Sequence, residues 1–161
     1  MAAKQSAGIL LYRLVGGEPE LLLVHPGGPF WATKDLGAWS IPKGEYGEGE
    51  EPRACALREL GEELGPTAPS LDVGALVQLG EVKQKGGKAV SAWAAEAEFD
   101  PAELRSNTFS VQWPPRSGVE REFPEVDRAE WFDPAEARRR INPAQAAFVD
   151  RLLACIGERE G

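Results

Sequence analysis

The 161-residue sequence contains only two cysteines and one histidine. Cys55 and Cys155 lack the spacing of a disulfide framework, so we expect two small thiols that are buried or half-buried. His25 follows the apolar run 21–24, and spacing ties no serine, cysteine or paired carboxylate to it. We therefore expect His25 to be a strand-end residue rather than a catalytic base.

Long apolar runs and an excess of basic residues are also missing. No run is long enough for a transmembrane helix or a signal peptide, so we expect a cytoplasmic protein with no membrane partner. The 18 basic and 26 acidic residues give a net charge of −8, which argues against a nucleic-acid partner. A length of 161 residues with 42% hydrophobic content predicts a single domain over 1–161.

Much of the acidity lies in one segment, 44–66, which reads GEYGEGEEPRACALRELGEELGP. Pro52 suits the first turn of a helix, where the missing N–H has no partner to lose. Gly65 followed by Pro66 favours a helix end. These signals predict a helix over Pro52–Leu64.

Three carboxylates lie on one side of this helix. Glu59, Glu62 and Glu63 are at positions i, i+3 and i+4, and at about 100° per residue they point the same way. Like charges this close repel one another, and a bound cation would turn that cost into a gain. Hard oxygen ligands suit magnesium, manganese or calcium better than zinc.

The remaining sequence indicates an α/β protein with mixed element order. Strands are predicted near 7–13, 20–25, 39–41, 73–79, 88–98 and 128–132, and helices near 52–64, 134–140 and 143–156. Two long irregular stretches are expected at 26–38 and 101–122. Long loops in a compact domain often carry specificity.

The acidic segment resembles the Nudix hydrolase family, whose box reads G-x5-E-x7-R-E-U-x-E-E-x-G-U, with U an aliphatic residue. The box positions are filled by Gly44, Glu50, Arg58, Glu59, Leu60, Glu62, Glu63 and Gly65. Pro66 departs from the last aliphatic position, but it touches only the loop after the helix. The resemblance implies the Nudix fold, a mixed β-sheet sandwiched between helices.

The resemblance also implies a metal site. Glu59, Glu62 and Glu63 would bind one to three divalent ions, Mg²⁺ or alternatively Mn²⁺, together with the main-chain carbonyl of Gly44. The metal ions would hold the phosphates of a nucleotide, and water would attack phosphorus. Either Glu59 or Glu125 would complete the deprotonation of that water.

Residues outside the helix complete the implied site. Arg58 and Glu50 would pair and hold the loop against the helix. Relatives often supply one more carboxylate several residues before an aromatic that opens the last strand, and Glu125, six before Trp131, fits that description. Other carboxylates are close enough to be mistaken for it, namely Glu120, Glu122 and Asp127.

Beyond the box, the chain resembles the branch that cleaves dinucleoside polyphosphates such as diadenosine tetraphosphate. Lys43 and Lys88 are placed to contact phosphate oxygens as point charges, and Trp39 is the aromatic assigned to the substrate site. Two features depart from that branch: Ala92, where an aromatic is usual, and the inserted segment 29–35. The loop aromatics Phe30, Trp31 and Trp113 are further candidates for stacking on a base.

Three hypotheses follow. The first is a magnesium-dependent pyrophosphohydrolase of a dinucleoside polyphosphate. The second directs the same chemistry at a nucleotide sugar, a nucleoside triphosphate or a diphosphoinositol phosphate. The third is a non-catalytic module that binds a nucleotide for regulation, which the intact carboxylate cluster disfavours. Both a monomer and a homodimer agree with the sequence.

Overall fold

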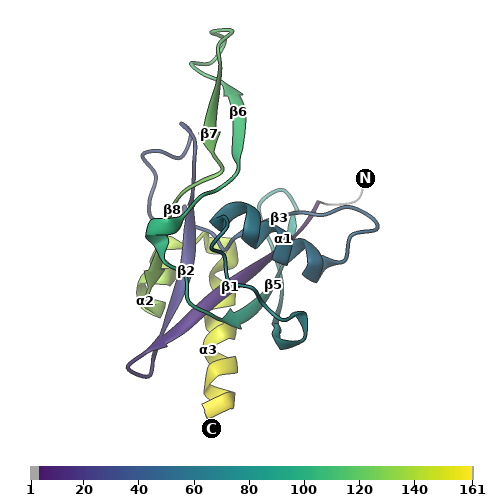
Figure 1. Cartoon of the computed structure of the whole chain (residues 1–161), viewed down its shortest axis with the longest axis vertical. Helices are drawn as coiled ribbons and strands as arrows, with labels where there is room; N and C mark the ends of the chain where they lie inside the picture. The colour runs from purple at the N-terminus through teal and green to yellow at the C-terminus, as the bar shows by residue number, and fades with distance from the viewer. Residues whose placement is uncertain (1–3, 161) are drawn as a thin grey trace.

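The computed structural model describes residues 4–160 and contains a mixed six-stranded sheet (Figure 1). The strand order is β4-β5-β1-β2-β8, and β3 also pairs with β1. β1 and β5 are parallel, and the other pairs of this sheet are antiparallel. The strands of the sheet are β1 (Gln5–Val15), β2 (Glu18–Pro26), β3 (Lys43–Glu45), β4 (Val77–Lys83), β5 (Ala89–Glu96) and β8 (Val126–Phe132).

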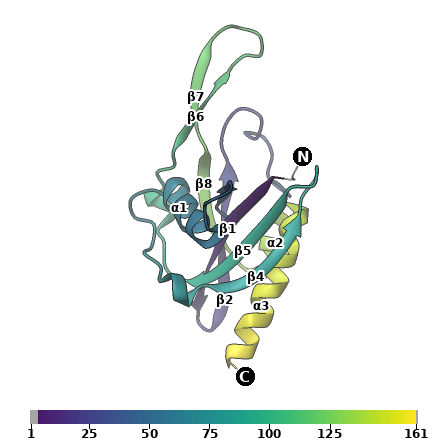
Figure 2. The same ribbon diagram turned by 90° about the vertical axis from the view of Figure 1, so that its right-hand side faces the viewer.

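Helices cover both faces of the sheet (Figure 2). The helices are α1 (Pro52–Leu64), α2 (Pro134–Arg140) and α3 (Ala146–Glu160), with short 3-10 turns η1 (Val73–Ala75), η2 (Pro101–Glu103) and η3 (Pro143–Gln145). Successive β1 residues face opposite sides: Leu10 packs in the α3 cluster, and Ile9 and Leu11 pack in the α1 cluster. This arrangement confirms the predicted α/β class and the sheet sandwiched between helices.

The central helix α1 has the predicted bounds, because local signals fix both ends. A carboxylate oxygen of Glu51 accepts a hydrogen bond from the Ala54 N–H at 3.1 Å, and Pro52 occupies the first turn. Gly65 has a φ of 100°, which favours glycine. Leu60 and Leu64 are buried against the sheet. The three carboxylates lie on the other side of the helix.

Several predicted strands are displaced or shortened. Segment 39–41 is not a strand: Trp39 and Ser40 make only isolated bridges, and the strand begins at Lys43. Segment 73–79 begins with a 3-10 turn, so β4 starts later. Strand β5 is shorter than 88–98, and 143–156 is a 3-10 turn followed by α3. Most of these differences arise at glycine and proline positions, where periodicity is weakest.

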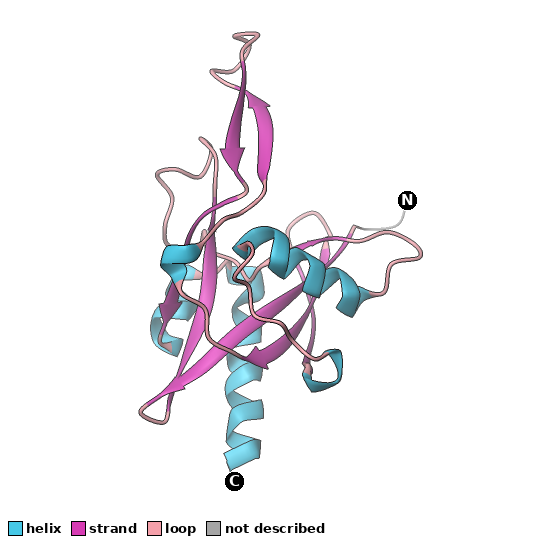
Figure 3. Ribbon diagram, viewed as in Figure 1, coloured by secondary structure: helices cyan, strands magenta, loops and turns pink. Residues whose placement is uncertain are grey.

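Segment 101–122 was expected to be irregular, and this prediction is wrong. It contains η2, β6 (Thr108–Gln112) and part of β7 (Glu120–Pro124), and the two strands form an antiparallel hairpin. The hairpin projects from the main sheet (Figures 1 and 3). Its cross-strand partners Phe109 and Phe123 have ring centroids 6.3 Å apart. The alternation in TFSVQ is the strand signal that sequence reasoning missed.

The single histidine and the two cysteines lie where the sequence predicted. His25 is buried in β2, with Nδ1 2.7 Å from Asp127 Oδ1 and Nε2 2.6 Å from the Lys34 carbonyl oxygen. Cys55 is buried and Cys155 partly buried, and both thiols are free. Among the helices of residues 4–160, none is long and apolar enough to cross a membrane.

Candidate active site

The carboxylate side of α1 lies next to the loop strand β3. Glu59 and Glu63 are each 9% exposed, and Glu62 is half-buried. A Cβ atom on Gly44 would lie 2.0 Å from Glu59 Cδ. Only glycine therefore lets the Glu59 carboxylate rest against the backbone at position 44.

Arg58 is the centre of an ion-pair network. Its Nε donates to Glu50 Oε2 at 3.0 Å and its Nη2 to Glu50 Oε1 at 3.2 Å. Its Nη1 donates to Glu59 Oε1 at 2.9 Å and to Glu62 Oε2 at 3.1 Å. The structure thus contains the predicted pairing of Arg58 with Glu50, a bidentate contact that ties the loop to the helix.

Among the carboxyl groups of the described residues, Glu63 has the most strongly raised pKa. Its Oε2 accepts a hydrogen bond from the Lys43 backbone N–H at 2.9 Å. Burial, followed by the neighbouring charges of Glu59 and Glu125, raises the pKa of Glu63 to about 8. Burial and the charge of Glu62 also raise the pKa of Glu59. A carboxylate in this environment gains from a cation.

Glu125 reaches the same site from the junction of β7 and β8. Its N–H donates to the Asn107 carbonyl at 2.8 Å, and its carbonyl accepts from the Gly27 N–H at 2.9 Å. Burial, then the charge of Glu62, raises the pKa of Glu125. Trp131 lies near the end of β8 rather than at the start of a strand.

The competing carboxylates lie elsewhere. Glu120 and Glu122 are exposed on the projecting hairpin, and Asp127 contacts His25. Glu125 is the member of this group that lines the cavity. The structure therefore brings Glu125 together with the box carboxylates and keeps Glu120, Glu122 and Asp127 out of the cavity wall.

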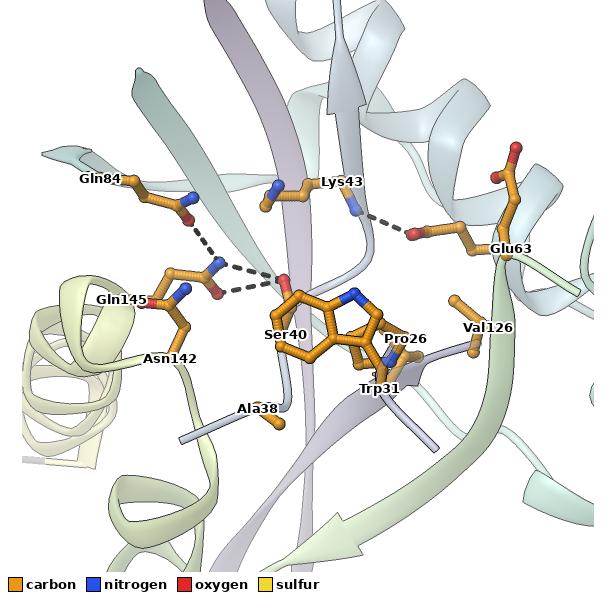
Figure 4. Close-up of a pocket in the computed structure, with 12 residues that line it drawn as sticks. Pro26, Trp31, Ala38, Ser40, Lys43, Glu63, Gln84, Val126, Asn142 and Gln145 are labelled. Atoms are coloured by element: carbon orange, nitrogen blue, oxygen red, sulfur yellow. Dashed lines mark hydrogen bonds between the residues drawn. The ribbon is translucent and has the colours of Figure 1, made fainter. Parts of the chain in front are cut away.

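A cavity of ≈ 250 Å³ lies beside Glu63 and Glu125 (Figure 4). Its amide side chains stand on one side and Glu63 on the other, and the Trp31 indole lies across it. The lining residues are Val24, Pro26, Trp31, Ala38, Ser40, Lys43, Glu63, Gln84, Glu125, Val126, Asn142 and Gln145.

The three predicted substrate-binding residues have different surroundings. Lys43 lines the cavity, and burial lowers the pKa of its ammonium group. Lys88 is exposed before β5, and its charge also lowers the pKa of Lys43. Trp39 is fully buried, and its Nε1 donates to Asp35 Oδ1 at 2.8 Å. Trp39 offers no surface for a base, so that part of the prediction is wrong.

Sequence reasoning did not assign the amide wall of the cavity. Asn142 and Gln145 belong to the turn η3 and its cap, whereas Gln84 lies in a turn far from them in the chain. No spacing linked Gln84 to the other two. Trp31 was predicted only as one of three loop aromatics that could stack on a base. Its cavity position depends on the fold of 26–38, which the Lys34 carbonyl contact with His25 helps to hold.

The donor set suits a hard divalent cation. Glu59, Glu62, Glu63 and Glu125 provide only oxygen atoms, as Mg²⁺ and Mn²⁺ prefer. In the side-chain positions seen here, Glu59 and Glu62 each turn an oxygen to Arg58. No group of three acidic, histidine or cysteine side chains within residues 4–160 is already arranged around a metal position. Three of these carboxylates could therefore bind one cation only after their side chains rotate.

Comparison with known proteins identifies the class. A family model described as NUDIX domain matches residues 3–152. The chain therefore belongs to the NUDIX family of hydrolases, whose members use divalent metals and act on nucleotide substrates. This confirms the predicted family and enzyme class.

Individual relatives are more distant. The RNA pyrophosphohydrolase of Brucella ovis is 29% identical over 156 residues, covering 83% of each chain. A Caenorhabditis elegans Ap4A hydrolase in a binary complex has a TM-score of 0.65 at 20% identity, over 97% of this chain and 99% of that chain. The NUDIX domain of Shewanella oneidensis NrtR, complexed with ADP ribose, has a TM-score of 0.64 at 16% identity, over 97% and 90%. At these identities the two structures show the fold alone.

Proposed function

We propose that this protein hydrolyses a phosphoanhydride bond of a nucleotide, with Glu59, Glu62, Glu63 and Glu125 and the Gly44 carbonyl holding Mg²⁺ or Mn²⁺. The observation that supports this proposal best is the buried position of Glu63, whose pKa is raised to about 8. Leaving a carboxylate without a cation in such a place is costly. A bound divalent ion would neutralise phosphate charge and acidify a water molecule.

The protein's own groups would position the reactants. Arg58 holds the loop through Glu50, and Lys43 and Lys88 would contact phosphate oxygens. The base that receives the proton of the attacking water is either Glu59 or Glu125. The ion pairs of Arg58 are with Glu50, Glu59 and Glu62, so we expect a substitution of Glu125 to leave that network intact.

The proposed substrate is a dinucleoside polyphosphate. The cavity of ≈ 250 Å³ suits one nucleoside, with the phosphates directed toward Glu63. The same chemistry on a nucleotide sugar, a nucleoside triphosphate or a diphosphoinositol phosphate is the alternative. The similarity to an RNA pyrophosphohydrolase favours one further candidate, the phosphorylated 5′ end of RNA.

A hydrolysis screen separates these substrates. Wild type and Glu62→Gln are incubated with Mg²⁺ and diadenosine polyphosphates, diguanosine polyphosphates, nucleoside triphosphates, nucleotide sugars, diphosphoinositol phosphates and 5′-triphosphorylated RNA. We expect selective cleavage of a dinucleoside polyphosphate that the variant lacks. Cleavage of another class keeps the chemistry and rejects the substrate, whereas activity that survives in the variant, or in EDTA, contradicts the proposal.

Trp31 is expected to stack on the nucleoside base. It is 38% exposed and lines the cavity. Trp31→Ala should raise KM about tenfold with little change in kcat, since base stacking on an aromatic contributes roughly 1–3 kcal/mol.

The neighbouring Phe30→Ala is the matched control, because Phe30 is 55% exposed and its ring meets Trp113, not the cavity. KM and kcat of both variants are measured by steady-state kinetics and compared. An equal effect of the two substitutions would assign the loop a structural role instead.

A further inference from the structure

Gln145 has a fixed amide orientation. It is 0% exposed, and its Oε1 accepts a hydrogen bond from the Ile41 N–H at 3.1 Å. A backbone N–H can only donate, so the oxygen of the amide must face Ile41. The Nε2 group then donates to Ser40 Oγ at 3.0 Å and to Gln84 Oε1 at 2.8 Å (Figure 4).

This contact fixes the next amide in turn. Because Gln84 Oε1 faces Gln145, the Gln84 NH2 group points away from Gln145. Among residues 4–160, no side chain or backbone group accepts a hydrogen bond from that NH2 group. Gln84 lines the cavity, so it presents a donor there.

Asn142 is fixed in the same manner by a different backbone group. Its Oδ1 accepts from the Ala144 N–H at 2.9 Å, which caps the turn η3. Its NH2 group has no acceptor within the described part of the chain, and Asn142 also lines the cavity. Both amides lie on the side of the cavity away from Glu63 (Figure 4).

We propose that Gln84 and Asn142 are specificity residues that select a 6-oxopurine base, guanine or hypoxanthine, in the cavity beside Trp31. This inference rests on the proposed function and names the base that its substrate carries. Two NH2 donors require a ligand edge with two acceptors. A 6-oxopurine offers N7 and O6, both acceptors, whereas adenine offers the N7 acceptor beside an N6 donor. An adenine edge would oppose a donor to a donor and leave polar groups unpaired once the base covers them.

The cavity supports a base rather than a phosphate at this end. Val24, Pro26 and Ala38 give it apolar walls, and Trp31 gives it an aromatic face. The cationic side chain that lines the same cavity is Lys43. The carboxylates Glu63 and Glu125 also line it, so a nucleoside is placed with its base at the amides and its phosphates toward the carboxylates.

Binding of nucleoside monophosphates tests this inference without requiring hydrolysis. The affinities of wild type for GMP, IMP, AMP and 7-deaza-GMP are measured with Mg²⁺ by calorimetry. We expect GMP and IMP to bind about tenfold more tightly than AMP, the usual size of discrimination by a paired base contact. The 7-deaza analogue, which lacks the N7 acceptor, should lose about fivefold relative to GMP.

Two isosteric variants test the residues themselves. Asn142→Asp keeps the oxygen that caps η3, and Gln84→Glu keeps the oxygen that faces Gln145; each replaces the NH2 donor with an acceptor. Each should weaken GMP binding about tenfold and leave AMP binding equal or tighter. Gln78→Glu, which adds the same charge at an exposed position on β4, should change neither affinity.

The opposite results are equally clear. AMP binding as tight as GMP binding, equal losses for both nucleotides in the variants, or no binding of any of the four nucleotides would overturn the inference. Hydrolysis without base preference would reject the base assignment and keep the proposed function. Base preference without hydrolysis would reject the proposed function and keep the base assignment.

Discussion

Glu63→Gln is expected to lower kcat for nucleotide hydrolysis by about 100-fold or more, since losing even the support of a metal ligand costs about 10 to 100-fold. The glutamine side chain has nearly the same shape, and its oxygen can still accept the hydrogen bond from the Lys43 N–H. What it removes is a negative charge from the proposed metal site. Steady-state hydrolysis as a function of Mg²⁺ concentration should show a loss of activity that added Mg²⁺ restores only in part.

The same substitution is expected to stabilise the metal-free protein at alkaline pH. Ionising Glu63 costs folding free energy because its pKa rises from 4.5 to about 8 in the folded protein. The protonated carboxyl contributes stability that is fully present below pH 4.5 and lost as pH rises through about 8. At pH 9 in EDTA, Glu63→Gln should therefore unfold with a free energy higher by on the order of 5 kcal/mol.

Urea unfolding at pH 5 and pH 9 measures this difference. The advantage of the variant should be small at pH 5 and largest at pH 9. Glu48→Gln, at an exposed position of the loop between Gly44 and Glu50, is the matched control and should show neither effect. Addition of Mg²⁺ should stabilise wild type more than Glu63→Gln, since only a ligand that binds the folded state shifts the equilibrium. Equal stabilisation of both proteins would contradict a metal role for Glu63.

Gly44→Ala is expected to disrupt the site through a single methyl group. The added Cβ would lie 2.0 Å from Glu59 Cδ, 2.2 Å from its Oε1 and 2.4 Å from its Oε2, so the Glu59 carboxylate must move. Mg²⁺ affinity should fall about 10 to 100-fold, the size of effect seen when the support of a metal ligand is removed. Titration calorimetry with Mg²⁺ measures this change.

Gly47→Ala is the matched control in the same loop. A Cβ at Gly47 meets no atom within 4 Å, so Mg²⁺ affinity and activity should stay as in wild type. Circular dichroism of both variants checks that the fold persists. A Gly44→Ala protein that is folded and binds Mg²⁺ normally would show that the contact between Glu59 and residue 44 has no part in metal binding.

The sequence alone determined the helix and its carboxylates. Pro52, Gly65 and the helical repeat act within a few residues of one another, so the bounds of α1 and the shared side of Glu59, Glu62 and Glu63 follow from local geometry. The box spacing also predicted the contact between Arg58 and Glu50, and the family model confirms the class. Substrate contacts for Lys43 and Lys88 stay predictions.

Only the tertiary structure decided which of the distant candidate residues join this helix. Glu125 enters the site through backbone bonds to Asn107 and Gly27, and Trp39 leaves the list of substrate residues because it is buried in the core. The amide wall depends on Gln145, whose orientation follows from the Ile41 N–H. These relations join segments far apart in the chain, and they arise from packing and hydrogen-bond satisfaction in the folded state, which no local pattern encodes.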